Sequence, residues 1–373
     1  MEINVGAVIS ANRKQKGITQ QALADFVGVS KASVSKWETG QSYPDITLLP
    51  ILAAYFDVSI DKLMAYDAQL SSTEIRRIYT SMKQAFETQP GDAVLKSIRN
   101  LIRRYYACYP FLLQMGLLIL NHYDLLPGAS QTAKVTEYVN EARLLFVRVR
   151  QNSQEAQLTA KAVELEGYSL LLLQRHDDVL ALLGEYVPEQ LPADSLIAGA
   201  FQQKGDLQRA IATSQSGLMQ DLSIIMSQLT NYMTLLNDDP NRLAATYQRG
   251  QAIAKAFDLA TLNPAVWLNF QLAALNGFAQ QDKTDEAVAL LQEFTHVLMA
   301  TKMPLTLHGD AYFDAIEPWL EQLDLGSQSP RVSGQAKQVL ADFVLQNPAL
   351  AKIRTLSEVQ PLLAELKQVS GHR

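Results

Sequence analysis

The apolar positions of this chain recur at helical spacing and are interrupted by short polar turns, most clearly between residues 19 and 41. There, Thr19 is placed to cap one short helix and Ser30 is placed to cap a second. Gly28 and Val29 fall between them, at a tight turn. The apolar side of the first helix consists of Ala22, Leu23, Phe26 and Val27. The pattern therefore predicts two short helices joined as a hairpin.

The second helix of this hairpin separates apolar from polar residues. Val34 and Trp37 lie three positions apart, so they can face inward together. The residues left pointing outward are Lys31, Ala32, Ser33, Ser35 and Lys36. A short, exposed, polar and basic helix of this kind suits a DNA groove.

The flanking residues extend the pattern to a whole module. The positions concerned are Arg13-Lys14, Thr19-Gln20, Leu23-Ala24, Gly28-Val29-Ser30, Val34-Ser35, Trp37-Glu38-Thr39-Gly40, Pro44, Leu49, Leu52-Ala53, Phe56, Val58-Ser59, Asp61 and Leu63. With these residues, the segment 1–63 resembles the helix-turn-helix domain of the Xre family, the lambda repressor and Cro class. The resemblance implies a five-helix DNA-binding domain over residues 1–66; the alternative is a bare helical hairpin within a larger α-fold.

Pro50 departs from the family pattern, because proline inside a helix costs about 3 kcal/mol. We therefore expect the fourth helix to start late, with Thr47 as its N-cap and Pro50 in its first turn.

The resemblance also implies which residues contact DNA. Gln20 and Gln41 would contact phosphate, and the base edges would be read from the start of the outward helix. Lys31 can bond guanine and Ala32 can meet a thymine methyl group. The complete candidate set is Gln20, Ser30, Lys31, Ala32, Ser33, Ser35, Lys36 and Gln41. Because these side chains discriminate weakly, affinity should depend on phosphate contacts and on two copies of the domain.

Composition and charge narrow the class of protein. The 373 residues are 48% hydrophobic with a net charge of −6, which allows a large core and argues against nonspecific wrapping of nucleic acid. Cys108 is the single cysteine, so no intrachain disulfide can form and a reducing compartment is expected. The most apolar run, 111–120, is shorter than the roughly 20 residues that span a bilayer. We expect a soluble, cytoplasmic protein with no membrane contact.

The apolar periodicity first lapses at residues 66–72, where we place the domain boundary with a linker at 67–72. Ser71 or Ser72 can cap a helix running toward Glu87, and a second helix is expected from Asp92 to about Cys108. The arginines and lysines of these two helices are interpreted as solvated surface residues. The alternative is that some of them contact DNA or the small domain. The large domain would occupy residues 73–373, with a C-terminal cap at about 327–373.

The large domain shows an internal repeat. Nine residues before each of three alanines stands a bulky apolar residue, with a polar turn between: Phe201 and Ala210, Leu236 and Ala245, Phe278 and Ala287. The same frame accepts Leu172 with Ala181. Spacings of 35 and 42 residues resemble the tetratricopeptide repeat. The chain is therefore predicted to be all-α, with a helical array whose concave face can hold a ligand; irregular stacked helices are the alternative.

No catalytic pattern is present in the sequence. The five histidines are scattered, and there is no paired His/Cys spacing, nucleophile elbow or phosphate loop. Cys108 is interpreted as a small core residue, with a redox-sensing thiol as the alternative. We expect no enzyme activity, no metal and no cofactor.

Ligand-binding candidates are amides, because an amide side chain donates and accepts hydrogen bonds as a peptide backbone does. Asn269 and Asn276 lie two helical turns apart and should share a face. The complete set adds three residues, Gln228, Asn231 and Gln271. Solvated surface amides are the alternative. Tyr232, Trp267 and Phe270 are expected in the core.

An Xre-type head joined to such an array resembles the Rgg, PlcR and PrgX peptide-pheromone-sensing regulators in domain order and repeat type. The resemblance implies a homodimer that holds two heads over a near-palindromic operator in double-stranded DNA and that binds a short signalling peptide. The alternative is an interaction scaffold, in which the repeat array binds a protein and the head tethers it to DNA.

Overall fold

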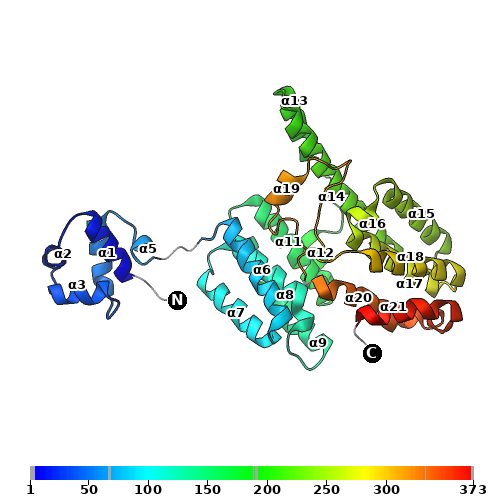
Figure 1. Ribbon diagram of the computed structural model, residues 1–373, viewed down its shortest axis with the longest axis horizontal. Coiled ribbons are helices and arrows are strands. Elements are labelled where there is room, and N and C mark those ends of the chain that lie inside the picture. Colours follow the sequence, from blue (N-terminus) through cyan, green and yellow to red (C-terminus); the bar gives the residue numbers. More distant parts are fainter. Residues whose placement is uncertain (1–4, 66–68, 188, 190–191, 332, 371–373) are drawn as a thin grey trace.

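The computed structural model describes residues 5–65, 69–187, 189, 192–331 and 333–370, and these residues are helical apart from loops and one isolated β-bridge. In Figure 1 the N-terminal domain stands apart from the rest of the chain. Its elements are α1 (Val5–Gln15), α2 (Gln20–Val27), α3 (Lys31–Glu38), η1 (Ile46–Leu48), α4 (Leu49–Phe56) and α5 (Ile60–Leu63). The predicted boundary falls partly on residues 66–68, which lie outside the described residues.

The predicted hairpin is confirmed as α2 and α3. Thr19 Oγ1 accepts from the Ala22 amide and Ser30 Oγ accepts from the Ser33 amide, so both N-caps form. Gly28 has φ 82°, a left-handed conformation that costs glycine little. Val34 and Trp37 are buried as predicted. The turn and both caps therefore fix the angle at which α3 leaves α2.

Two details of the sequence prediction are wrong. Ala22 and Phe26, which the sequence places on the apolar side of this helix, are exposed, Phe26 at 56%, and the ring of Phe26 lies 4.1 Å from that of Tyr55 in α4. The fourth helix is capped by Leu48 rather than Thr47, since Asp45 captures the Thr47 amide and hydroxyl in the preceding 3-10 turn. Pro50 does lie in the first turn of α4.

The large domain begins with a helical layer built on α8, which is apolar on nearly every side and is therefore surrounded by other helices. Ser71 caps α6 in a complete capping box with Glu74. The elements of this part are α6 (Ser72–Thr88), α7 (Gly91–Arg104), α8 (Tyr109–His122), η2 (Tyr123–Leu125), α9 (Gln131–Lys134), the π-helical turn η3 (Val135–Val139), α10 (Asn140–Asn152), α11 (Ala156–Leu172) and α12 (His176–Leu183). Cys108 lies fully buried in this core, as the core interpretation expects.

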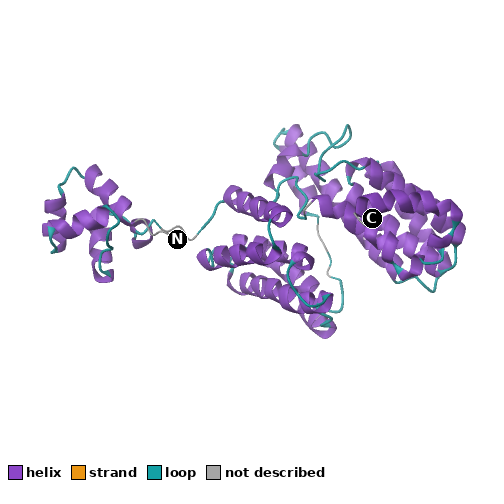
Figure 2. Cartoon of the chain, turned by 60° about the horizontal axis from the view of Figure 1, so that its bottom comes forward, coloured by secondary structure: helices purple, strands orange, loops and turns teal. Residues whose placement is uncertain are grey.

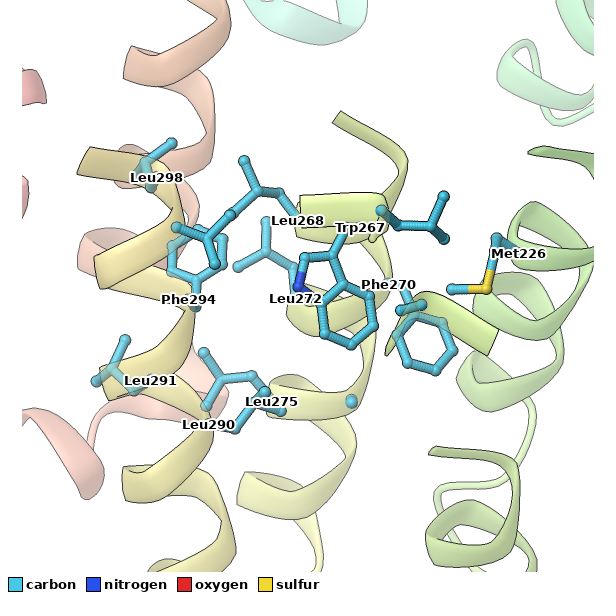
Figure 3. Close-up of a cluster of buried hydrophobic side chains, with 14 of the residues drawn as sticks. Met226, Trp267, Leu268, Phe270, Leu272, Leu275, Leu290, Leu291, Phe294 and Leu298 are labelled. Carbon is cyan, nitrogen blue, oxygen red and sulfur yellow. The ribbon is translucent and has the colours of Figure 1, made fainter. Parts of the chain in front are cut away.

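A second core forms around α17 (Figure 3). Trp267, Phe270 and Leu275 from this helix meet Phe294 of α18 and Met226 of α14. The elements here are α13 (Ala193–Gln203), α14 (Leu207–Thr234), α15 (Pro240–Ala256), α16 (Leu259–Leu262), α17 (Pro264–Gln280) and α18 (Thr284–Ala300). Gly250 of α15 sits so close to the ring of Phe270 that a Cβ there would lie 2.1 Å from it. This contact lets α15 pack directly on α17.

The four polar turns of the sequence repeat each join two helices. They connect α11 to α12, α13 to α14, α14 to α15, and α17 to α18, and each of these pairs packs together. Figure 2, coloured by secondary structure, shows the chain as helices joined by loops. Ala210 and Ala287, the small residues of two repeats, are buried where the helices meet. The predicted all-α class, with a helix-turn-helix domain followed by a helical array, is confirmed.

The C-terminal part folds back on both cores. Its elements are α19 (Glu317–Gln322), α20 (Ser333–Gln346), η4 (Pro348–Leu350), η5 (Ile353–Thr355), η6 (Ser357–Val359) and α21 (Gln360–Ser370). Helices α20 and α21 make up most of the predicted C-terminal cap; they pack together, and α21 also packs on α18. Residues 332 and 371–373 of that cap lie outside the described residues.

Residues 321–331, which we call the strap, cross from α19 to the surface of α6. Arg76 donates to the main-chain oxygens of residues 321, 323 and 324 at 2.6–3.3 Å. Tyr79 donates to the carbonyl of residue 330 at 2.8 Å, and the ammonium of Lys83 donates to Gln328 Oε1 at 2.7 Å and to the carbonyl of residue 329 at 2.8 Å. Arg76 and Lys83, expected from sequence to be solvated, therefore tie the first helix of the large domain to its C-terminal part.

Candidate nucleic-acid interface and ligand groove

Helix α3 presents the outward residues that the sequence predicts. Lys31, Ala32 and Lys36 are exposed, whereas Ser33 and Ser35 are half-buried. The hydroxyls of Ser30 and Ser33 lie 2.9 Å apart, and Ser30 is also engaged as the N-cap. Lys31 and Ala32 at the start of α3 are therefore the side chains freest to meet base edges, while Ser30 mainly holds the helix in shape.

Of the six basic residues of the domain, two are paired with a carboxylate. Arg13 is paired with Glu38, and Lys16 with Asp57. In the part of the chain that the structure describes, the lysines at 14, 31, 36 and 62 have no acidic group within ion-pairing distance. Two of these four belong to α3 itself. Half of the unpaired positive charge of the domain is thus on the helix that carries the candidate base readers.

Gln20 is held by a buried carboxylate. Glu38, whose side chain is 7% exposed, accepts from Arg13 Nε at 2.5 Å and from Gln20 Nε2 at 2.9 Å. Burial raises the pKa of Glu38, but the hydrogen bonds from Arg13 and Gln20 outweigh it and the net pKa is lowered. This network joins α1, the start of α2 and the end of α3, and it leaves one N–H of Gln20 for a phosphate.

We expect Glu38→Gln to lower the local stability of this domain by about 2 kcal/mol, because charge-assisted hydrogen bonds to Arg13 and Gln20 are lost. Since the folded pKa of Glu38 lies below its unfolded value of about 4.3, the stabilisation is complete above that pH and is lost as pH falls through the lowered value. Hydrogen exchange of amides in residues 13–41 measures both effects. Equal protection in variant and wild type at pH 7 would contradict the role.

The segment after α3 adds exposed residues that the sequence analysis did not single out. Gln41, a predicted phosphate contact, is exposed there. Tyr43 and Ile46 are 61% and 78% exposed. The exposure of these two side chains beside α3 is seen only in the folded chain, because aromatic and aliphatic residues are more often buried.

A groove of about 540 Å³ lies in the large domain among α14, α17 and α20. The residues lining it are Ser227, Thr230, Asn231, Thr234, Val266, Asn269, Leu272, Ala273, Asn276, Val339, Leu340 and Phe343. Three of the five predicted amides, Asn231, Asn269 and Asn276, are among them. Every one of these lining residues is uncharged, so the groove suits a ligand of uncharged polar and apolar groups.

The asparagines keep hydrogen-bonding capacity for a ligand. Asn269 Nδ2 donates to the carbonyl of Ala265 at 2.9 Å, which leaves its Oδ1 as an acceptor. Asn276 Oδ1 accepts from Asn347 Nδ2 at 2.9 Å, which leaves its own N–H groups as donors. The groove therefore offers both an acceptor and donors along α17, the combination that an extended peptide backbone requires.

Two predicted ligand residues lie elsewhere. Gln271 is completely buried in the core, because it follows Asn269 by two positions and roughly 200° of helix rotation turns it away from the groove. Gln228 is exposed but does not line the groove, since it lies about 100° around α14 from Ser227. Trp267 and Phe270 are core residues as expected, but Tyr232 is 43% exposed and not in the core.

Other candidate chemistry stays inside the fold. His122 is fully buried and stacks on Phe86 at 4.7 Å, and burial lowers its pKa to about 4, so it is neutral at pH 7. Across the described residues, no three side chains of the metal-binding types gather into a site. Within the same ranges, no helix combines the length and apolar character needed to cross a bilayer.

Comparisons with known proteins agree with the geometry of the N-terminal domain. A helix-turn-helix family model matches residues 9–63. The chain is 36% identical over 62 residues to the HTH-type transcriptional activator BcrR of Enterococcus faecalis, covering 17% of this chain and 30% of that protein. It is 38% identical over 95 residues to the uncharacterized HTH-type transcriptional regulator YqaE of Bacillus subtilis, covering 24% of this chain and 82% of that protein.

These matches define a class of DNA-binding regulator, and the chain belongs to the helix-turn-helix, Xre-type family of transcriptional regulators. A third relative is the prophage-derived HTH-type regulator YonR of Bacillus subtilis, 38% identical over 52 residues, which are 14% of this chain and 48% of that protein. The chain thus spans less than half the length of BcrR and of YonR. Among solved structures, the apo form of ComR from S. thermophilus covers 80% of this chain and 96% of its own at 13% identity. Its TM-score is 0.21, too low to carry an argument.

Proposed function

We propose that this regulator binds a near-palindromic operator as a homodimer and acts in the cytoplasm, by binding rather than by catalysis. The support comes from α3, whose candidate base-reading residues, Lys31 and Ala32, are exposed. Lys31 is flexible and Ala32 is small, so neither distinguishes strongly between bases. One such head discriminates weakly, so two heads on half-sites about 34 Å apart, or a multiple of that distance, would supply the selectivity. The candidate phosphate contacts are Gln20 and Gln41, with Lys36 beside them on α3.

We further propose that the groove among α14, α17 and α20 binds a short peptide that regulates DNA binding. The observation that carries this proposal is that Asn231 and Asn269, from two different helices, line one uncharged groove together with Asn276. Amides placed along a groove can pair with successive peptide groups, while the apolar side chains of α20 pack on the ligand's side chains.

The strap offers a route from this groove to the DNA-binding head. Helix α20 lines the groove through residues 339–343 and follows the strap in the chain, and the strap is hydrogen-bonded to α6. Helix α6 is the first helix after the head. A ligand that binds better to one position of α20 would therefore shift the population of α6 positions, by no more than its differential affinity.

Lys83→Met tests this route. The substitution removes the two strap hydrogen bonds of a nearly buried ammonium, and we expect a stability loss of about 2 kcal/mol. Operator affinity without ligand should be unchanged, whereas its change on adding a peptide fraction should be lost. Lys96→Met on the exposed side of α7 is the matched control. An unchanged ligand response in the Lys83 variant would sink the route.

Genome-wide mapping of the DNA bound by the full chain tests the function as a whole. We expect an inverted repeat with half-sites one helical turn or a multiple apart, and affinity that falls steeply with salt. Bound sites without any shared sequence would contradict sequence-specific regulation. Bound sites carrying a single half-site would contradict the homodimer.

A further inference from the structure

Helices α13 and α14 leave a large apolar surface uncovered. Both helices are fully described, and no residue of α13 is buried. Leu196 of α13 is 75% exposed, Leu207 at the start of α14 is 61% exposed, and Leu235 just after α14 is 78% exposed. In Figure 1, α13 projects from the rest of the large domain. Exposed large apolar side chains that gather on one surface mark interaction sites.

Five of the six large apolar residues exposed on α14 form one stripe, and Ile224 is the sixth. Ile211, Leu218, Ile225 and Tyr232 lie seven residues apart and are each 43–45% exposed, and Leu207 precedes the first of them by one helical turn. A seven-residue spacing keeps side chains on nearly the same side of a helix and is the spacing by which helices pair with one another. We call these five residues the α14 stripe.

The charge of this surface indicates which partner fits it. Of the 28 residues of α14, only Arg209 and Asp221 are charged, and Asp194 is the charged residue of α13. A surface so poor in charge can face its own copy across a two-fold axis without placing like charges together.

We propose that the α13–α14 surface, centred on the α14 stripe, is the interface between two copies of this chain. The proposal rests on the homodimer of the proposed function and names the surface that forms it. The large apolar side chains exposed on α13 and α14 amount to on the order of 800 Å², about what one partner buries in a standard-sized interface. A second copy would therefore cover this surface with an area sufficient for a stable dimer.

The same helix also borders the ligand groove. Ser227 and Asn231 line the groove, and the α14 stripe lies about half a turn away around the helix. A shift of α14 that widens or narrows the groove would therefore move the stripe as well. This places ligand binding and the pairing of two heads on opposite sides of one helix.

The test compares the mass of the full chain with that of Leu207→Glu/Leu218→Glu, by sedimentation or light scattering. We expect a dimer for the wild type and a monomer for the variant, with unchanged helicity because both side chains are exposed. Leu144→Glu on α10, also exposed at 53%, is the matched control and should stay dimeric.

A cysteine cross-link keeps the test decisive if the charged variant fails to fold. Cys108 is completely buried, so Leu218→Cys supplies the accessible thiol, and a bismaleimide should link two such chains. Leu144→Cys should not cross-link.

Three outcomes would overturn the proposal, and each has a different consequence for the proposed function. If the folded charged variant stays dimeric, the surface is wrong, and the proposed function stands provided that the variant binds operator. If the wild type is monomeric at every concentration and on operator DNA, both the surface and the homodimer fail. A stoichiometric folded partner of another kind that protects Leu218→Cys from labelling would replace the dimer with the scaffold interpretation.

Discussion

Replacing Lys31 and Ser33 together with alanine is expected to lower operator affinity by at least about 30-fold. Lys31 is exposed at the start of α3 and has no acidic group within ion-pairing distance in the described structure. A lysine contact to base or phosphate contributes about 1–3 kcal/mol per head, and a dimer loses it twice. Fluorescence anisotropy with an operator fragment at fixed salt measures the change.

Lys62→Ala is the control for this prediction, because Lys62 is exposed in the same domain but belongs to α5, which packs on α1 and α4 rather than on α3. The salt dependence adds an independent readout. If Lys31 contacts phosphate in both heads, the slope of log affinity against log salt should fall by about 2 in the variant. Full affinity in a folded Lys31/Ser33 variant would exclude α3 as the reading element.

Replacing Asn231 and Asn269 together with leucine is expected to weaken ligand binding about 30-fold or more. Each removes an amide that lines the groove, and leaving a peptide group unpaired costs about 1–3 kcal/mol. Both residues are exposed, so the fold should keep its stability. The shift in thermal unfolding produced by a peptide fraction of spent medium measures the loss, since a ligand stabilises only the form that binds it.

Gln228→Leu is the matched control for the groove. It changes an amide to leucine on the same helix, three residues from Asn231, at a position that does not line the groove. We expect its thermal shift to equal that of the wild type. An equal loss in Gln228→Leu and in the asparagine variant would place the ligand outside the groove.

Local sequence patterns predicted the N-terminal domain because its structure is made by neighbours in the chain. Thr19 and Ser30 cap helices that start at the next residue, and Gly28 turns the chain between them. The same holds for the four repeat turns, whose polar residues end one helix and begin the next. Each of these features depends on residues fewer than ten positions apart.

Local sequence patterns could not predict features that depend on contacts between residues far apart in the chain. Arg76 and Lys83 resemble solvated surface residues in sequence, yet each is bonded to the strap roughly 245 residues away. Gln271 and Asn269 are both amides on one helix, and only the packing of α17 shows that one lies in the core and the other in the groove. Phe26 was assigned to a buried face that no helix completely covers.

The sequence by itself therefore determined that this chain is helical, that its first domain is of the Xre type, and which residues of α3 point outward, because capping and periodicity act over one or two helical turns. Only the tertiary structure decided that α14, α17 and α20 enclose a groove, that Glu38 holds Gln20, and that the stripe of α14 is left uncovered. These properties arise where segments far apart in the chain come together, and the burial of each side chain depends on which helix arrives to cover it.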